Sequence, residues 1–146
     1  MEKNLLIIDD EQCVLDSLSR SLWDAGFGLT TTTDPLKAME MIKSHAPPVV
    51  VTDLNMHGMD GLAVLECIKE FNPRIQVILI TGEDCGEEAA AAVERGAYDF
   101  ILKPFNKREL MAAVNRAFDL VCLLEENGTV REKIPGNPRE GCGRGD

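Results

Sequence analysis

Short runs of apolar residues alternate along this chain with longer stretches in which apolar positions recur every three or four residues. The short runs are continuous, which is typical of strands that are buried on both faces of a parallel sheet. The second run gives the weakest signal of this kind. The predicted strands cover residues 4–8, 27–32, 49–53, 75–80 and 98–102.

The stretches between these runs carry the spacing of amphipathic helices. Local signals mark several helix ends. Asp34 followed by Pro35 predicts a helix start, Asn106 with Glu109 resembles a capping pair, and Gly96 is a typical residue just after a helix end. The expected helices run from just after a cap-like pair at Asp9 and Gln12 to residue 25, from 36 to about 45, from 60 or 61 to about 71, from 87 to 95 and from 106 to about 126.

This alternation through short connections predicts an α/β fold, a three-layer α/β/α sandwich in which helices cover both faces of a five-stranded parallel sheet. A chain of 146 residues is expected to form one domain, here residues 1–126. From residue 127 onward glycine, proline and charged residues dominate, which predicts a disordered tail or linker at 127–146.

Composition excludes several classes of partner. The formal net charge of −10 argues against direct nucleic-acid binding, because a phosphate backbone needs clustered Lys and Arg. No apolar run approaches the roughly 20 residues that span a bilayer. No signal-peptide pattern precedes Asp9, so we expect a cytoplasmic location and no membrane partner. The 5 cysteines have no CxxC spacing, which argues against a structural zinc site.

Polar residues lie at the ends of four of the predicted strands. Asp9 and Asp10 follow the first strand, Asp53 ends the third, Thr81 follows the fourth and Lys103 follows the fifth. The carboxyl ends of parallel strands meet at one edge of the sheet, where α/β folds bind ligands. We therefore expect these side chains to share one crevice.

Each of these residues has a simpler explanation when it is taken alone. An acid pair after a strand is more often a helix cap, a threonine there usually belongs to a turn, and Lys-Pro is usually a surface turn. Taken together, three carboxylates would repel one another and push at least one toward protonation. A bound Mg²⁺, which prefers carboxylate, water and phosphate oxygens, explains the set better.

These motifs resemble the receiver domain of a two-component response regulator, over residues 3 to about 124. The resemblance rests on residues 7–11 (IIDDE), 53–61 (DLNMHGMDG), 80–82 (ITG) and 96–105 (GAYDFILKPF). It implies a flavodoxin-like, doubly wound (βα)5 fold. It also implies a phosphorylation-activated switch in a phosphorelay, which catalyses its own phosphorylation and dephosphorylation and is not otherwise an enzyme.

The resemblance assigns roles to the residues at the strand ends. Asp53 is the implied phosphoacceptor, and Thr81 and Lys103 would bind the phosphoryl oxygens. The implied ligands of Mg²⁺ (or Mn²⁺) are Asp10, Asp53, the backbone carbonyl of Asn55 and, through water, Asp9. A carboxylate that attacks a phosphohistidine forms an acyl phosphate, and the cation offsets the repulsion between the two anions.

The resemblance also implies how the signal leaves the site. The Thr81 hydroxyl would turn toward the phosphoryl group, and the ring of Phe100 would move into the space that this opens. Tyr98 is expected on the same face of the strand. The alternative is that Phe100 is an ordinary core ring. The resemblance also implies a cis Lys103–Pro104 bond, which costs little because X–Pro bonds favour trans by only about 0.5–1 kcal/mol.

Two positions are expected to set the lifetime of the phosphoryl group. Asn55 and Glu83 lie two residues after Asp53 and Thr81, where receivers line the route of hydrolytic water. His57 departs from the family, which often has proline at that position. The simplest interpretation of His57 is an exposed loop residue without a catalytic role. Its loop is expected to have more conformational freedom in the unfolded state than a loop with proline would have.

Partners follow from the same resemblance. A histidine kinase is the implied phosphodonor. A downstream effector protein or domain would dock on the face formed by residues 87–95, 98–102 and 106–126. Extra apolar positions on the last helix are alternatively the surface of a homodimer. The sequence leaves open whether the chain acts alone or is the receiver part of a longer transcriptional regulator, and it identifies neither the kinase nor the regulated process.

Two other functions share part of this pattern. A Mg²⁺-dependent hydrolase of the haloacid dehalogenase type also uses a nucleophilic aspartate, but it needs an acid two residues later, where this chain has Asn55. A flavin-binding module needs a phosphate loop after the first strand, where the acids at 9–11 would repel a phosphate. Both are therefore less favoured than the receiver.

Overall fold

The computed structural model describes residues 3–22, 26, 28–54, 61–82 and 86–133. Within these ranges strands and helices alternate in the predicted order, and β4, α4, β5 and the starts of α2 and α5 differ by one residue from the expected bounds. No helix in the described ranges is both long and apolar enough to cross a bilayer. The elements are β1 (Asn4–Ile8), α1 (Gln12–Leu22), β2 (Gly28–Thr32), α2 (Pro35–His45), β3 (Val49–Asp53), α3 (Gly61–Phe71), β4 (Gln76–Thr81), α4 (Gly86–Glu94), β5 (Asp99–Leu102) and α5 (Lys107–Lys133).

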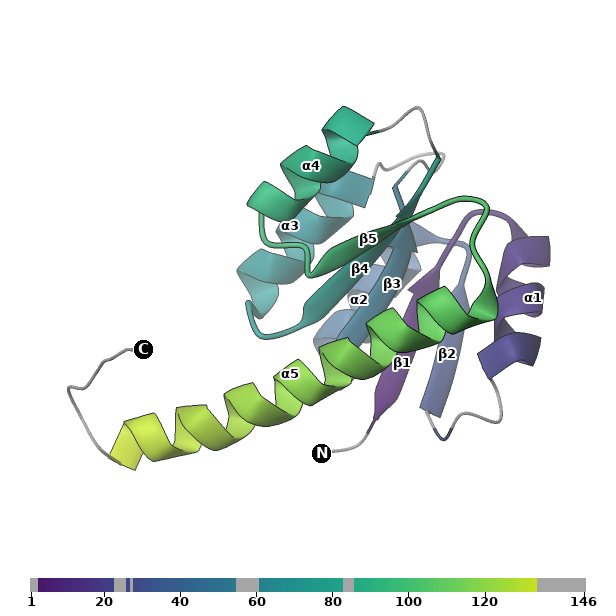
Figure 1. Ribbon diagram of the computed structural model, residues 1–146. Coiled ribbons are helices and arrows are strands. Elements are labelled where there is room, and N and C mark those ends of the chain that lie inside the picture. The colour runs from purple at the N-terminus through teal and green to yellow at the C-terminus, as the bar shows by residue number, and fades with distance from the viewer. Residues whose placement is uncertain (1–2, 23–25, 27, 55–60, 83–85, 134–146) are drawn as a thin grey trace.

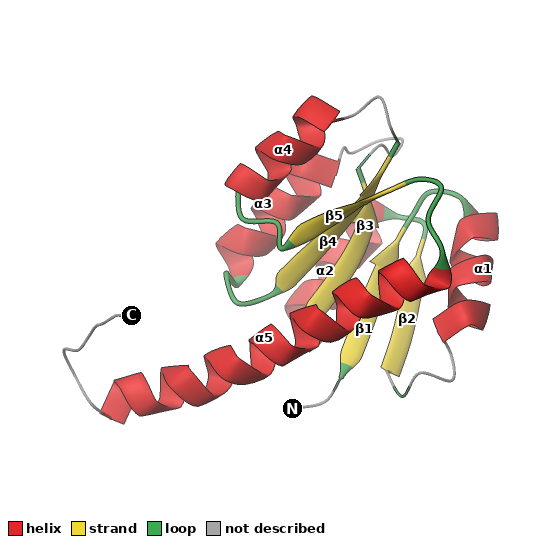
Figure 2. Ribbon diagram, viewed as in Figure 1, coloured by secondary structure: helices red, strands yellow, loops and turns green. Residues whose placement is uncertain are grey.

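The described strands form one parallel, five-stranded sheet in the order β2-β1-β3-β4-β5. Helices α1 and α5 cover one face, and α2, α3 and α4 cover the other (Figure 1, Figure 2). This confirms the expected three-layer, flavodoxin-like doubly wound fold. The strand order reverses between β1 and β3, which opens a crevice beyond their carboxyl ends.

Two separate cores hold the layers together, because successive residues of a strand point to opposite faces. On β3, Val49 and Val51 belong to the core under α1 and α5, whereas Val50 belongs to the core under α2, α3 and α4. All residues of β3 are buried, from Val49 to Asp53. The continuous apolar run in the sequence reflects this burial on both faces.

Local signals at three helix ends are confirmed. The Asp34 carboxylate accepts a hydrogen bond from the backbone N–H two residues on, at 2.9 Å, and Pro35 follows in the first turn of α2. Asn106 accepts a bond from the Glu109 backbone N–H at 2.8 Å. Gly96, after α4, has a φ of +109°, which side-chain-bearing residues rarely adopt.

Helix α5 is longer than expected. The sequence pattern predicts an end near Glu126, whereas the helix runs to Lys133. Residues 127–133 contain no proline, and a single glycine such as Gly128 costs a helix only about 1 kcal/mol. The glycine therefore does not end the helix. The rest of the predicted tail, like residues 23–25 of the expected first helix, lies outside the described residues.

Tyr98 lies on the opposite side of the sheet from the position expected. It precedes β5, which begins at Asp99, and it packs against the core under α1 and α5. Phe100 packs against the other core. The expectation that the two rings share a face is wrong, because the two-residue alternation holds only within the strand itself.

Candidate functional site

The predicted site residues come from neighbouring strand ends. Asp53 and Thr81 are the last residues of β3 and β4, and Lys103 follows β5 directly. The Lys103 backbone N–H donates to the Thr81 carbonyl at 2.7 Å. The ladder between β4 and β5 therefore continues one step beyond β5 and fixes Lys103 beside Thr81.

Three carboxylates meet at this edge. Asp9, Asp10 and Asp53 each offer one oxygen, and these oxygens all lie within 4.8 Å of one another. Asp9 is 1% exposed and Asp53 is 5% exposed. The sheet thus brings together acids that are more than 40 residues apart in the sequence, as the order of the strands predicted.

Lys103 supplies a positive charge to the cluster. Its Nζ lies 3.1 Å from Oδ2 of Asp53 and donates a hydrogen bond to it. Burial lowers the pKa of Lys103, but the hydrogen bond to Asp53 and the charges of Asp53, Asp9 and Glu11 outweigh burial and raise the pKa above its ordinary value. Lys103 is therefore cationic at neutral pH and holds the Asp53 carboxylate in place.

Asp9 has a buried carboxylate that the described residues compensate only in part. Its Oδ1 accepts a hydrogen bond from the Glu11 backbone N–H at 2.9 Å, but its buried Oδ2 has no hydrogen-bond partner in the described part of the chain. Burial raises the pKa of Asp9 to about 6; the Glu11 bond and the charge of Lys103 oppose the rise, and the charges of Asp53 and Asp10 add to it. The sequence predicted such a shift from repulsion, whereas burial is its largest cause.

The acid cluster fits a hard divalent cation. The ligand oxygens of an octahedral Mg²⁺ lie about 2 Å from the ion, so opposite ligands are about 4 Å apart. Carboxylate oxygens of Asp9, Asp10 and Asp53 lie within 4.8 Å of one another, close to that span. The orphaned Oδ2 of Asp9 points to the same need, because a buried acceptor without a partner is costly. These residues could hold Mg²⁺ or Mn²⁺.

The two residues of the expected switch lie on adjacent strands. Thr81 is fully buried, and its hydroxyl donates to the Gly82 carbonyl at 3.3 Å. Phe100 is partly buried against the core under α2, α3 and α4, and Leu79 is its partner in the register of β4 and β5. By strand alternation, Thr81 points to the same face as Leu79 and Phe100.

The remaining site predictions divide into two groups. The Lys103–Pro104 bond is cis, as predicted. Asn55, His57 and Glu83 lie outside the described residues, so their expected roles stay predictions.

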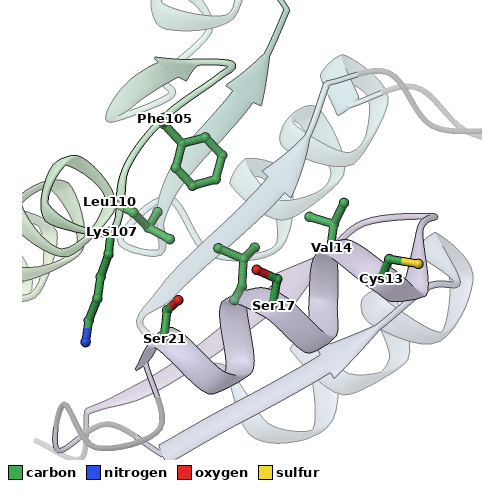
Figure 3. Close-up of a pocket in the computed structure, with 8 residues that line it drawn as sticks. Cys13, Val14, Ser17, Ser21, Phe105, Lys107 and Leu110 are labelled. Carbon is green, nitrogen blue, oxygen red and sulfur yellow. The ribbon is translucent and has the colours of Figure 1, made fainter.

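A groove between α1 and α5 was not predicted from the sequence. It has a volume of about 310 Å³. Figure 3 shows Phe105 and Leu110 across the groove from Val14 and Ser17 of α1; Cys13, near the start of α1, also contributes to the lining. Phe105 comes two residues after Lys103, and Cys13 three after Asp10, so two of the residues that line the groove are close in sequence to the acid cluster. Phe105 directly after Lys103-Pro104 was the only local hint, because the groove forms where two distant helices approach.

A second groove lies along β5 and α5. It has a volume of about 530 Å³, and Phe100 and Leu102 contribute to its lining together with Arg108, Ala112 and Arg116. Leu102 is 43% exposed, unusually high for a leucine on a strand. This groove lies on the face that the sequence predicted as an output surface.

Thr52 was also missed. It precedes Asp53 in β3, is fully buried, and donates its hydroxyl to the Asp53 carbonyl at 3.2 Å. The signal was present in the sequence, because a hydroxyl in a strand buried on both faces costs free energy unless it is hydrogen-bonded.

Comparison with known proteins agrees with this arrangement. A family model described as the response regulator receiver domain matches residues 5–115. The nitrogen assimilation regulatory protein NtrX of Azorhizobium caulinodans is 36% identical over 128 residues, which are 86% of this chain and 28% of that protein. The DNA-binding transcriptional regulator NtrC of Escherichia coli K12 is 37% identical over 111 residues, which are 76% of this chain and 24% of that protein.

Solved structures give the same result. The receiver domain of NtrX from Brucella abortus superposes with a TM-score of 0.75 at 38% identity, covering 79% of this chain and 98% of that chain. The chain spans only about a quarter of the length of the curated relatives, 28% of NtrX and 24% of NtrC. The motifs, the fold and the matched family model lead to one conclusion: this chain belongs to the response regulator receiver domain family.

Proposed function

We propose that the chain is a phosphorylation-activated switch in which Asp53 accepts a phosphoryl group from the phosphohistidine of a histidine kinase. One observation carries this proposal: the buried Asp53 carboxylate sits in a cluster with Asp9 and Asp10 and accepts a hydrogen bond from the Lys103 ammonium at 3.1 Å. A nucleophile, a cation site and a fixed positive charge are the parts that phosphoryl transfer needs.

The transfer uses groups that the chain itself supplies. An oxygen of Asp53 bonds to phosphorus while the bond between phosphorus and the histidine nitrogen breaks, and the imidazole leaves with the bonding pair and takes up a proton. Lys103, already held against Asp53, remains beside the new acyl phosphate and neutralises one of its oxygens. The Thr81 hydroxyl is free to exchange its long bond to Gly82, 3.3 Å, for a phosphoryl oxygen.

A divalent cation completes the site in this proposal. Asp9, Asp10 and Asp53 would hold Mg²⁺ or Mn²⁺, with the backbone carbonyl of Asn55 as a further ligand. Bound there, the ion supplies positive charge that offsets the repulsion between the carboxylates and the incoming phosphoryl group. Asn55 and Glu83 would set the lifetime of the acyl phosphate.

The groove between α1 and α5 is the proposed docking surface for the kinase. The phosphohistidine must reach Asp53, so the kinase has to contact surfaces that border the acid cluster. Cys13 and Phe105, which line the groove, follow Asp10 and Lys103 by only three and two residues, and Val14 and Leu110 give the groove apolar walls (Figure 3). An apolar groove suits an amphipathic helix that carries the histidine.

The groove along β5 and α5 is the proposed output surface. Movement of Thr81 would let the Phe100 ring shift, and Phe100 lines this groove together with the exposed Leu102. A change at Asp53 would thereby alter the surface offered to an effector protein or to a downstream domain. The alternative is that α5 forms a homodimer interface, because Leu123 of α5 is 53% exposed.

Phosphorylation of the full chain by a small donor tests the proposal. With Mg²⁺ and phosphoramidate, intact-protein mass spectrometry should show the gain of one phosphoryl group. Asp53→Asn should abolish the gain, whereas Asp119→Asn, which removes an exposed carboxylate on α5, should leave it unchanged. A wild-type chain that never gains mass, or an Asp53→Asn variant that still does, would refute the proposed function.

A further inference from the structure

The residue that follows Asp53 is held by hydrogen bonds to two other segments. The Leu54 backbone N–H donates to the Ile80 carbonyl at 2.9 Å, and the Leu54 carbonyl accepts from the Gly61 N–H at 2.7 Å. These bonds tie the end of β3 to β4 on one side and to the first residue of α3 on the other. The chain therefore leaves Asp53 in a fixed direction.

Gly61 approaches the Asp53–Leu54 peptide more closely than any other residue type could. A Cβ added to Gly61 would lie 2.6 Å from the Leu54 Cα and 2.8 Å from the Asp53 carbonyl oxygen. Both distances are shorter than real Cβ atoms tolerate, and both neighbours are backbone atoms that cannot turn aside. The start of α3 thus presses directly on the Asp53–Leu54 peptide.

The Thr52 hydroxyl holds the carbonyl oxygen of that same peptide. It donates to the Asp53 carbonyl at 3.2 Å from a side chain that is fully buried. Valine would fill the same space, and Val49, Val50 and Val51 precede Thr52 in the strand. What distinguishes threonine from its neighbours is therefore the hydroxyl. The bond is long for an O–H···O contact, so its effect should be moderate.

We infer that Thr52 is a positioning residue for the phosphoacceptor, an inference that rests on the proposed function. With the Asp53 carbonyl held by Thr52 and the Leu54 amide held by Ile80, the backbone torsion ψ of Asp53 is fixed. The β3 ladder fixes its φ. The direction of the Asp53 Cα–Cβ bond is then set, and the bond to Lys103 fixes the remaining side-chain torsions.

Two substitutions separate the hydroxyl from the shape of Thr52. Thr52→Val keeps the branched shape and removes the hydroxyl, whereas Thr52→Ser keeps the hydroxyl and removes the methyl group. A net hydrogen bond is worth about 0.5–1.5 kcal/mol, so Thr52→Val should slow phosphorylation of the full chain by phosphoramidate by roughly 2- to 10-fold at saturating donor. The donor concentration for half-maximal rate should stay the same, and Thr52→Ser should recover most of the rate.

A matched core variant controls for stability. Val50 is buried on the same strand and, by alternation, the same face as Thr52. Val50→Ala should lower the free energy of unfolding, measured by urea titration, by at least as much as Thr52→Val. Because it leaves the hydroxyl in place, the phosphorylation rate of the folded protein should not change.

The outcomes distinguish this inference from the proposed function. Each of three results would overturn the role of the hydroxyl while leaving Asp53 as phosphoacceptor. These are a wild-type rate in Thr52→Val, an equal slowing in Val50→Ala, and a Thr52→Ser variant as slow as Thr52→Val. A wild-type chain that is not phosphorylated would instead refute the proposed function.

Discussion

At Asp9, burial opposes the charge of the ionised carboxylate. Asp9 is 1% exposed, one of its oxygens accepts no hydrogen bond from the described residues, and two other carboxylates lie beside it. A group placed this way opposes folding in its ionised form, because an uncompensated buried charge is costly. Such a position is retained more readily for binding than for stability, since a bound cation removes the cost.

The pKa of Asp9 predicts how stability depends on pH in the absence of divalent cations. Burial raises this pKa from 3.8 to about 6. Between these values the folded chain holds a proton that the unfolded chain has lost, so stability falls as pH rises. The stabilisation by protonated Asp9 is complete below the pKa of the unfolded chain, 3.8. It is lost as pH rises through the pKa of the folded chain, about 6. Its size is at most about 3 kcal/mol.

Urea titrations of the wild type and Asp9→Asn, from pH 4 to pH 8 in a chelator, measure this contribution. Other carboxylates titrate in both proteins, so the difference between the two curves isolates Asp9. The wild type should lose stability relative to Asp9→Asn as pH rises. Curves that stay parallel across the range would show that Asp9 titrates normally in the folded chain.

At the scale of elements, helix starts followed the sequence more closely than the end of α5 did. The caps at Asp34 and Asn106 form as predicted because each depends on a side chain and a backbone N–H only a few residues apart. The end of α5 was misplaced because a glycine weakens a helix without ending it. Composition predicted a tail from residue 127, whereas the helix continues to Lys133.

The start of α3 makes a testable contribution to the site. Gly61→Ala should lower the free energy of unfolding by about 1–3 kcal/mol, as overpacking typically does. It should also weaken Mg²⁺ binding, because the added methyl group meets the Asp53 carbonyl oxygen at 2.8 Å. Urea titration and Mg²⁺ titration followed by NMR measure the two effects.

Gly26→Ala is the matched comparison. Gly26 has a φ of +88°, and no atom of the described residues beyond its chain neighbours lies within 4 Å of an added Cβ, so its cost should come from backbone strain. It should destabilise the chain and leave Mg²⁺ affinity unchanged. Equal Mg²⁺ affinity in Gly61→Ala and Gly26→Ala would rule out the proposed contribution of the start of α3 to Mg²⁺ binding.

At the scale of the molecule, the net charge of −10 makes any cation stabilising to some degree. A specific Mg²⁺ site must therefore be separated from general screening. MgCl₂ should raise the thermal unfolding midpoint more than NaCl does at equal ionic strength. The expected gain in the free energy of unfolding is about 1.4 kcal/mol at a Mg²⁺ concentration ten times Kd.

Two further comparisons sharpen that experiment. The gain should be larger at pH 8 than at pH 5, because below its pKa of about 6 the proton on Asp9 competes with the metal. Asp10→Asn should reduce the gain, and Asp16→Asn, on the exposed surface of α1, should not. Identical midpoints in the two salts would argue that the acid cluster holds no specific cation.

The sequence by itself determined the order of the elements, the layers of the fold and the edge at which Asp9, Asp53 and Lys103 would meet. It could do so because periodicity shows which face of an element is buried, and because parallel strands all end at the same edge. Tertiary structure alone decided how closely these groups approach. The 3.1 Å bond joins residues 50 positions apart, and the raised pKa of Asp9 depends on burial by several segments. Tertiary structure also decided the groove between α1 and α5 and the side on which Tyr98 packs. A pattern along the chain carries no information on how far apart packed elements lie.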